Sequence, residues 1–417
     1  MKIIKRLSFF FLGMFLVSLL LWMMVDIKED IINNATSVQK KVEIHNINFY
    51  GFHDKKKVFS VHALSAWSGD DIDEAYLSDI VDGKIFALDG RILFQDLKAK
   101  KVYSNARYDS VFAENGISAL FMSSAYAEEK SKQDKILIEA EQLKYDSFRK
   151  MTYIENNIKL TNAKTDIVAD RAEIENEKNR ATFFGNIILS NDDVVITANR
   201  LISYLDEERN IVTGGVTLYW LAEPSRNATD SRKAEIRSKE TKITCQEMFY
   251  NKKKDEEFIT FNYNIKVVQN NKILYGDMAF YNGKEKKFYL YGNVKIELTS
   301  LEWLLKDQTK KKLKDKESKE AIKEKTYITG DELVFNRDNN DIIIRGDVHV
   351  DQPKNEAFAG IVNYTDKNEQ FTLLEAVKIR KKGKDWIDSE EAKMFLQEEV
   401  FEAMRRVVTE FTITKKK

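Results

Sequence analysis

The stretch IVADRAEIENEKNRATFFGNIILS at residues 167–190 and the stretch ITANRLISYLDEERNIVTGGVTLYW at residues 196–220 repeat one pattern 29 residues apart. Each begins with isoleucine and an alanine two positions later, continues through a polar turn, and ends on alternating apolar residues. Alternation with a period of two is typical of a strand that buries one face. Each stretch therefore predicts two short strands joined by a turn, NEKN or DEER.

The same pattern recurs along most of the chain. With a small residue as position zero, six units match, and their start positions are Ala140, Ala169, Ala198, Gly276, Gly330 and Ala359. Positions fourteen, eighteen and twenty are apolar in every unit, and a degenerate seventh unit begins at Cys245. Small residues at position zero indicate room in the interior. We expect stacked units to share one buried interior, since no such unit is stable alone.

Glycine occupies position sixteen in four units, at Gly185, Gly214, Gly292 and Gly346, whereas Asn156 and Glu375 replace it in two others. A glycine inside a strand predicts a β-bulge or a close approach of another backbone. The apolar parity also switches within the first half of each unit, which indicates a corner between short strands. The predicted fold class is therefore all-β: an elongated antiparallel β-jelly-roll or solenoid-like trough of repeated ~29-residue units, preceded by one transmembrane helix.

The composition excludes several classes of protein. Lys and Arg number 67 of the 417 residues and Asp and Glu also number 67, so the net charge argues against a nucleic-acid-binding surface. Apolar residues make up 43%, which suffices for a core. Because Cys245 is the single cysteine, an intrachain disulfide is impossible. Its place at the start of a repeat favours a buried structural thiol over a nucleophile.

The N-terminus indicates the location of the chain. Residues 7–25 form an uncharged apolar run, long enough to span a bilayer as a helix. Lys2, Lys5 and Arg6 precede it, and acidic residues follow it, so the positive-inside rule leaves the N-terminus in the cytoplasm. We therefore expect a single-pass inner-membrane protein whose bulk is periplasmic. A cleaved signal peptide is the alternative, although no small-x-small site follows the run.

The remaining chain divides by composition into segments. The predicted order is a cytoplasmic tip and transmembrane helix (1–30), a less regular β segment (43–117), a linker (118–135), the main array (136–300), a Lys-rich insertion (301–326), continued β repeats (327–380) and a tail (381–417). The linker contains an A-x-A site, Ala125 and Ala127, which leaves cleavage open. The insertion is either a solvated helix or loop or a basic arm for anionic head groups. The tail is either another unit from Ser389 or a helix capped by Asp388.

The strings at 138–161, 167–190 and 196–220, and the copy ILYGDMAFYNGKEKKFYLYGNVKIEL at 273–298, resemble the OstA-like domain of the LptA family of periplasmic lipopolysaccharide-transport proteins. The hallmark is an AD-x-L-x-Y half followed by a GNV-x-L half. The membrane run followed by VFSVHALSAW and KVYSNARYD is similar in layout to the membrane-anchored LptC, so the chain resembles an LptC–LptA fusion. Asn156 and the Lys-rich insertion depart from the family pattern.

The resemblance implies a twisted β-jelly roll that holds acyl chains inside and joins other protomers end to end. The implied partners are lipopolysaccharide, an inner-membrane ABC exporter complex and an outer-membrane translocon, with possible end-to-end self-association and no nucleic acid. We expect no cofactor, no metal and no enzymatic activity. The predicted lipid-binding residues are the interior-facing positions of the repeats: Ile138, Ala140, Ile154, Ile158, Leu160, Ile167, Ala169, Phe183, Ile187, Leu189, Ile196, Ala198, Val212, Val216, Leu218, Leu290, Val294 and Ile296.

The sequence also bears on other functions. The sequence has no phosphate-binding G-x-x-x-x-G-K-[ST] loop, and its histidines lack metal-ligand spacing. The acidic run Asp70, Asp71, Asp73 and Glu74 lacks the glycine and distal glutamate of a calcium loop, which favours an acidic loop. A structural periplasmic scaffold with a dry core and a polysaccharide-active enzyme remain as alternatives. Periodicity does not distinguish an open trough from a sealed one, and it does not give the lipid or the direction of transfer.

Overall fold

The computed structural model describes residues 43–68, 74–104, 109–122, 136–162, 165–204, 207, 209–221, 239–253, 256–314, 316–382 and 385–410. The apolar run 7–25 and the A-x-A site lie outside these residues. Among the described helices, none is both long enough and apolar enough to span a bilayer.

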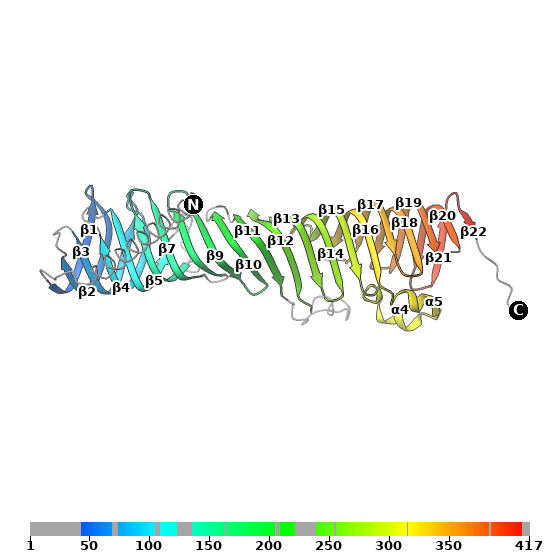
Figure 1. Ribbon diagram of the computed structural model, residues 1–417, viewed down its shortest axis with the longest axis horizontal. Helices are drawn as coiled ribbons and strands as arrows, with labels where there is room; N and C mark the ends of the chain where they lie inside the picture. Colours follow the sequence, from blue (N-terminus) through cyan, green and yellow to red (C-terminus); the bar gives the residue numbers. More distant parts are fainter. Residues whose placement is uncertain are drawn as a thin grey trace, which may run out of the picture.

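The described ranges form one long sheet that runs the length of the molecule (Figure 1). Its N-terminal strands are β1 (Glu43–His53), β2 (Lys56–Ser68), β3 (Ala75–Phe86), β4 (Ile92–Ser104) and β5 (Ser110–Phe121). The next group comprises β6 (Ile136–Asp146), β7 (Met151–Thr161), β8 (Asp166–Glu175), β9 (Arg180–Ser190), β10 (Val194–Tyr204) and β11 (Arg209–Trp220).

The C-terminal half continues the same sheet. Its strands are β12 (Thr241–Lys253), β13 (Glu256–Gln269), β14 (Lys272–Asn282), β15 (Lys287–Leu298), β16 (Thr326–Asn336), β17 (Ile342–Asp351), β18 (Asn355–Thr365), β19 (Gln370–Lys381), β20 (Trp386–Phe395), β21 (Val400–Met404) and β22 (Val408–Glu410). The connection between β15 and β16 contains a 3-10 helix, η1 (Glu302–Leu304), and two short helices, α4 (Asp307–Lys312) and α5 (Lys316–Ala321).

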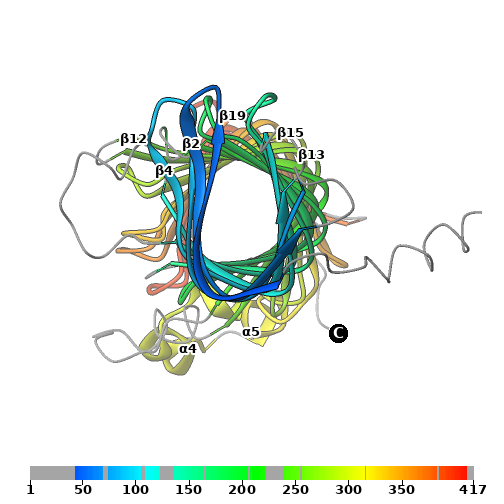
Figure 2. The same ribbon diagram turned by 90° about the vertical axis from the view of Figure 1, so that its left-hand side faces the viewer.

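Each strand from β1 to β20 pairs antiparallel with its successor in the chain, and β21 and β22 both pair with β20. The sheet does not close, because β1 lies at one end of the molecule and β22 at the other (Figure 1). Seen from the N-terminal end, the strands curve around a common axis (Figure 2). The predicted elongated antiparallel trough is thus confirmed.

The strand register explains the spacing of the repeat. Position eighteen of each unit lies opposite position zero of the next unit, as in the pairs Ile158–Ala169, Ile187–Ala198, Val216–Cys245, Val294–Gly330, Val348–Ala359 and Val377–Ser389. The same register therefore persists through the degenerate unit at Cys245 and into the tail. Because the apolar positions of neighbouring strands align, their side chains share one buried face.

The step at position sixteen is a two-residue bulge with left-handed backbone. Gly185 has φ +72° and Asn186 has φ +43°, and the ladder shifts register between Val168 and Arg171 on the adjoining strand. Glu375 keeps a positive φ of +66° in the last unit, although it lacks the freedom of glycine. The predicted bulge is thus confirmed, and the substitutions at this position preserve it.

Besides allowing the left-handed backbone, the glycine at this bulge leaves room for the side chain of a neighbouring aspartate. A Cβ added to Gly292 would lie 2.5 Å from the Oδ2 atom of Asp277 on the preceding strand, and the amide of Asn293 donates a hydrogen bond of 2.8 Å to that oxygen. Asn186 donates to Asp170 in the same way at 2.9 Å. The aspartate after position zero and the Gly-Asn step therefore form one interlocked corner.

The small residue at position zero predicted room in the interior, but the structure gives a different reason for its size. A Cβ on Gly276 would lie 2.6 Å from Cδ1 of Leu290, and a Cβ on Gly330 would lie 2.9 Å from Cγ2 of Ile344. The apolar side chain at position fourteen thus fills the space beside position zero. At these two positions, the small residue accommodates a packed neighbour and does not leave room in the interior.

The structure decides three points about the predicted segments. The predicted linker at 118–135 begins inside β5, whose Ala119 and Phe121 are buried, because β5 pairs with β6 and continues the sheet. The tail forms strands over 386–395 and 400–404, so the helical alternative is wrong. The Lys-rich insertion is not wholly solvated, because it buries Leu304, Leu305 and Leu313.

Candidate functional site

A cavity of about 900 Å³ lies inside the C-terminal half of the trough, and we call it the C-terminal chamber. Strands from β11 to β21 contribute to its wall, together with the connection between β15 and β16. Much of its lining is apolar, including Leu274, Ile328, Phe335, Ile342, Phe371 and Ile379. Because these side chains belong to the inward face of the sheet but are only partly buried, they border empty space.

Beside the chamber, two aromatic residues on strands that are not neighbours in the sheet pack against each other. Trp220, at the last residue of β11, packs edge-on against Tyr281 near the end of β14, with ring centroids 5.8 Å apart. The guanidinium of Arg337 lies 4.8 Å from the Trp220 ring centroid. All three residues line the chamber. This cluster joins the two walls of the trough where the chamber begins.

The connection between β15 and β16 covers the chamber, and we call residues 301–314 together with 316–325 the cover segment. In Figures 1 and 2, α4 and α5 lie against one side of the C-terminal strands. The segment carries many lysines, yet its apolar residues point into the chamber: Leu301, Trp303, Leu304, Leu305, Leu313 and Ile322 all line it. Leu305 is 1% exposed. The cover segment is therefore amphipathic and places its apolar side against the chamber.

The predicted lipid-binding residues all face the interior core. Of the eighteen, sixteen are buried, and Ile167 and Leu189 are partly buried against the same core cluster. Neighbours in the chain confirm the facing, because Ile187 is 1% exposed and Ile188 is 43% exposed. Ile138, Ile154 and Ile158 are closely packed, with no exposed surface. Contact between these residues and lipid stays a prediction.

The sequence did not predict the residues that border the chamber. Of the eighteen predicted residues, only Ile296 lines it. The missed residues include the aromatic side chains near strand ends, such as Trp220, Phe335 and Phe371, and the apolar residues of the cover segment. The run SLEWLL at 300–305 was the available signal, since it holds three leucines and a tryptophan beside a charged stretch.

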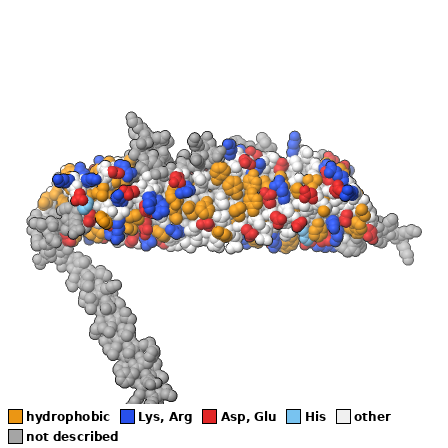
Figure 3. Space-filling view, turned by 90° about the horizontal axis from the view of Figure 1, so that it is seen from above, with side chains coloured by type: hydrophobic (Ala, Val, Ile, Leu, Met, Phe, Trp, Pro, Cys, Tyr) orange, Lys and Arg blue, Asp and Glu red, His pale blue; other side chains and the backbone are white. Residues whose placement is uncertain are grey.

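The outer surface mixes both signs of charge around apolar side chains, as Figure 3 shows for one face. Aromatic side chains stack there across strands, as in the ladder Trp67, Tyr76, Tyr103 and Phe112, with neighbouring centroids 4.5–6.1 Å apart. The rings face one another, so the ladder contributes cross-strand stabilisation.

Two polar sites contain residue types that can act as a nucleophile or bind a metal. The Cys245 thiol is buried and donates to the carbonyl oxygen of Glu247 at 3.3 Å, and burial raises its pKa to about 11. It is therefore a structural thiol, as predicted. Among the described residues, His349, Asp351 and Glu356 place ligand atoms within 4.8 Å of one another, but Lys382 already pairs with Asp351 at 2.5 Å. Asp70, Asp71 and Asp73 lie outside the described residues.

Comparison with known proteins identifies the repeat. Residues 166–287 match the family described as LptA/(LptD N-terminal domain) LPS transport protein. This span lies within the array that resembles LptA, and it does not extend over residues 43–117. No curated protein matches the chain.

Fifteen chains of solved structures match. One is the crystal structure of LptH, the LptA homologous periplasmic component of the conserved lipopolysaccharide transport device from Pseudomonas aeruginosa. It is 17% identical, with 28% of this chain and 75% of that chain covered and a TM-score of 0.23.

Proposed function

We propose, from the premise that residues 166–287 belong to the LptA/(LptD N-terminal domain) family of lipopolysaccharide-transport proteins, that the chain carries lipopolysaccharide across the periplasm in its trough. The observation that carries the proposal is the apolar C-terminal chamber inside a continuous antiparallel sheet. Burying hydrocarbon is worth about 0.8 kcal/mol per CH₂ group, so the acyl chains of lipid A need no specific polar site. The sugars remain outside, and the chain acts as a carrier and not as an enzyme.

The ends of the sheet support a bridging role. Among the described strands, β1 pairs with β2 alone, and it exposes Ile44, Tyr50 and Phe52, while Val407 and Val408 are exposed beside the other end. An exposed edge strand offers its backbone groups to a strand from another chain. We propose that one end meets an inner-membrane ABC exporter complex and the other an outer-membrane translocon or a second copy of the chain.

The same proposal places the protein at the inner membrane. Residues 7–25 would form the single transmembrane helix, with the N-terminus in the cytoplasm and the trough in the periplasm. Strands β1 to β5 would correspond to the LptC-like part. Pairing of β5 with β6 supports this fusion, because it joins that part to the array by the same strand pairing that links units within the array.

A scaffold with a dry core is the second candidate, and one observation favours it. Ile138, Ile154 and Ile158 have no exposed surface, so this section of the trough is filled by its own side chains. A lipid could pass here only if the walls separate. A scaffold would instead use the strand edges alone.

Photo-crosslinking in living cells separates these two candidates. A photoreactive residue replaces Leu189, on the inward face, or Ile188, which is 43% exposed on the outward face of the same strand. The carrier proposal expects lipopolysaccharide adducts at Leu189 and few at Ile188. Protein–protein adducts without lipid at either position, in protein that is folded, would contradict the carrier and favour the scaffold.

A further inference from the structure

We propose that the C-terminal chamber is a binding site for a long unbranched hydrocarbon chain, and that the cover segment is a hinged lid over it, latched by Glu369. This inference deepens the proposed function and rests on it, because it names the section of the trough that holds an acyl chain in the closed state.

The size of the chamber is that of a ligand site. Protein interiors are close-packed and contain few voids larger than a water molecule. A space of about 900 Å³ lies near the upper end of the roughly 300–1,000 Å³ that ligand sites span. A hydrocarbon chain is the ligand that matches its lining, to which β17 contributes Ile342 and β19 contributes Phe371 and Ile379.

The cover segment crosses the mouth of the trough between its two rims. The first rim consists of the hairpin turns at 337–341, 366–369 and 396–399, and the second rim consists of the connections at 299–325, 352–354 and 382–385. The segment leaves β15 at the second rim and reaches the first rim, where the Tyr364 hydroxyl donates to the Leu304 carbonyl at 2.5 Å. It then returns to the second rim and enters β16.

Glu369 is the latch on the first rim. Its carboxylate is fully buried and accepts hydrogen bonds from the Lys306 backbone N–H, the Thr309 hydroxyl at 2.5 Å and the Gln397 side-chain amide at 2.9 Å. Hydrogen bonds to an ionised acceptor are stronger than neutral ones. A second contact lies close by, since the Lys314 backbone N–H donates to Glu399 at 2.5 Å.

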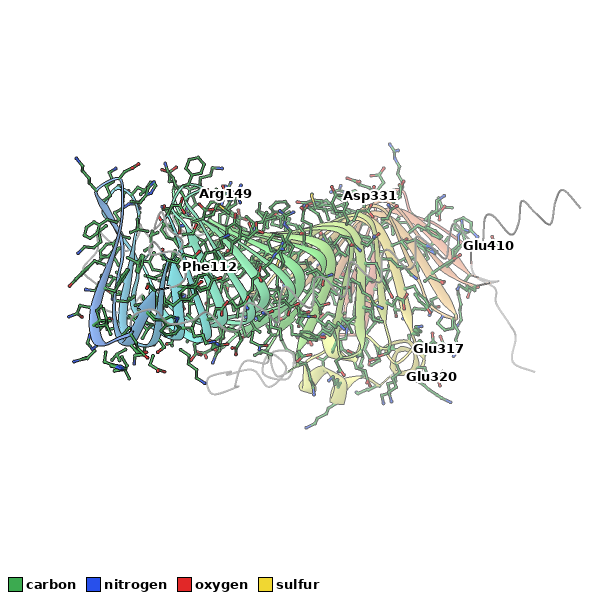
Figure 4. All side chains as sticks on the ribbon, turned by 60° about the vertical axis from the view of Figure 1, so that its left-hand side comes forward. Phe112, Arg149, Glu317, Glu320, Asp331 and Glu410 are labelled. Carbon is green, nitrogen blue, oxygen red and sulfur yellow. The ribbon has the colours of Figure 1, made fainter. Side chains whose placement is uncertain are left out.

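The contacts on the second rim are weaker and suit a hinge. Lys381 pairs with Glu317 at 3.1 Å and Lys354 pairs with Glu320 at 3.2 Å, and all four side chains are exposed. Figure 4 labels these two glutamates on α5, beside the C-terminal strands. Exposed ion pairs contribute little to stability. Both ends of the segment are also tied here by the chain itself. Opening at the first rim therefore breaks the Glu369 contacts together with the hydrogen bonds of Tyr364 and Glu399, while the second rim stays attached.

The test uses the purified full chain in detergent with cis-parinaric acid, a fluorescent fatty acid, as the probe. Glu369→Ala removes the latch, and Thr309→Val removes one donor with little change of shape. Glu398→Ala is the matched control, because Glu398 is exposed in the next hairpin turn on the same rim. Trypsin cleavage at the lysines of the cover segment reports lid opening, and stopped-flow fluorescence reports probe entry.

We expect both rates to rise about tenfold in Glu369→Ala, the change that corresponds to about 1.4 kcal/mol or roughly one such hydrogen bond. Thr309→Val should produce a smaller rise in the same direction, and the control should match the wild type. Equal rates in all four proteins would overturn the latch.

A second variant tests the chamber itself. Ala357 lines it and is only partly buried, so Ala357→Phe adds a ring to empty space. Loss of most probe binding in this folded variant supports the assigned site, and unchanged binding rejects it. Crosslinking at Leu189 is independent of these measurements. Lipid adducts there without probe binding would reject the chamber alone, whereas loss of both would reject the carrier function as well.

Discussion

Substitution of Gly185 by alanine tests whether the corner of each repeat depends on one close approach. Gly185 has φ +72°, and a Cβ there would overlap the carboxylate of Asp170 on the neighbouring strand. Left-handed backbone costs a non-glycine residue about 1–2 kcal/mol. Moving Asp170 also breaks its 2.9 Å hydrogen bond from Asn186, which is worth about 1 kcal/mol. We expect Gly185→Ala to destabilise the β8–β9 hairpin by about 2 kcal/mol, once the entropy that alanine removes from the unfolded chain is subtracted.

Gly215 supplies the matched control. It has φ +80° in another bulge, but a Cβ there would meet no atom within 4 Å. Gly215→Ala therefore carries only the backbone strain, about 1 kcal/mol after the entropy that alanine removes from the unfolded chain. Hydrogen exchange followed by mass spectrometry gives the opening free energy of each hairpin separately, which suits a repeat array whose units open locally.

A double-mutant cycle then isolates the contact. Asp170→Ala removes the carboxylate, so Gly185→Ala in that background should cost about 1 kcal/mol less than it does alone. Equal losses at Gly185 and Gly215, or additivity of the Asp170 and Gly185 changes, would refute the idea that aspartate and glycine form one interlocked corner.

Three further outcomes are expected from the contacts of single residues. Phe183→Ala should lower the stability of the array by about 3–5 kcal/mol in urea unfolding, because the ring is almost wholly buried and leaves a cavity. Native Cys245 should react with iodoacetamide at pH 8 far more slowly than the same thiol in urea, since its pKa is raised to about 11 by burial; equal rates would disprove that burial. Glu175→Gln should cost about 0.5 kcal/mol at neutral pH, a value typical of exposed ion pairs. The hydrogen bond from Lys178, ahead of that from Arg180, lowers the pKa of Glu175, so this stabilisation is present above its ordinary 4.5 and is lost as the pH falls through the lowered value; a cost independent of pH would exclude the ion pair.

The fold was predictable because the strand register, the inward or outward direction of each side chain and the bulge at each corner all depend on the local sequence. Position eighteen of one unit pairs with position zero of the next, so a spacing of 29 residues between Ala140 and Ala169 already fixes which residues lie opposite each other. Alternation then assigns the inward face, as the contrast between Ile187 and Ile188 confirms. The bulge at the corner was predictable as well, because a glycine inside a strand often marks a bulge or a close approach of another backbone.

The candidate site was less predictable because it depends on distance across the trough. Ile154 and Ile342 both occupy inward positions of the one sheet, yet the first is packed without exposed surface and the second borders the chamber. The separation of the two walls decides between these outcomes, and no local pattern encodes it. The lysines of the insertion also made its apolar side hard to recognise, because Leu313 stands among charged neighbours, away from the apolar run at 300–305 that holds Leu304 and Leu305.

Local pairing also explains why the trough accommodates a lid at all. Every strand up to β20 pairs with its successor, so a long connection leaves the ladder intact: Val294 lies opposite Gly330 across the cover segment as Ile187 lies opposite Ala198 across a tight turn. From β6 onward the connections on the first rim are two to five residues long, whereas the long ones after β5, β11 and β15 all leave from the other rim. The turns of the first rim are short, so Glu369 in one of them can hold the cover segment, whose two ends are both attached at the second rim. The asymmetry of the rims therefore favours a lid that hinges at one rim and latches at the other.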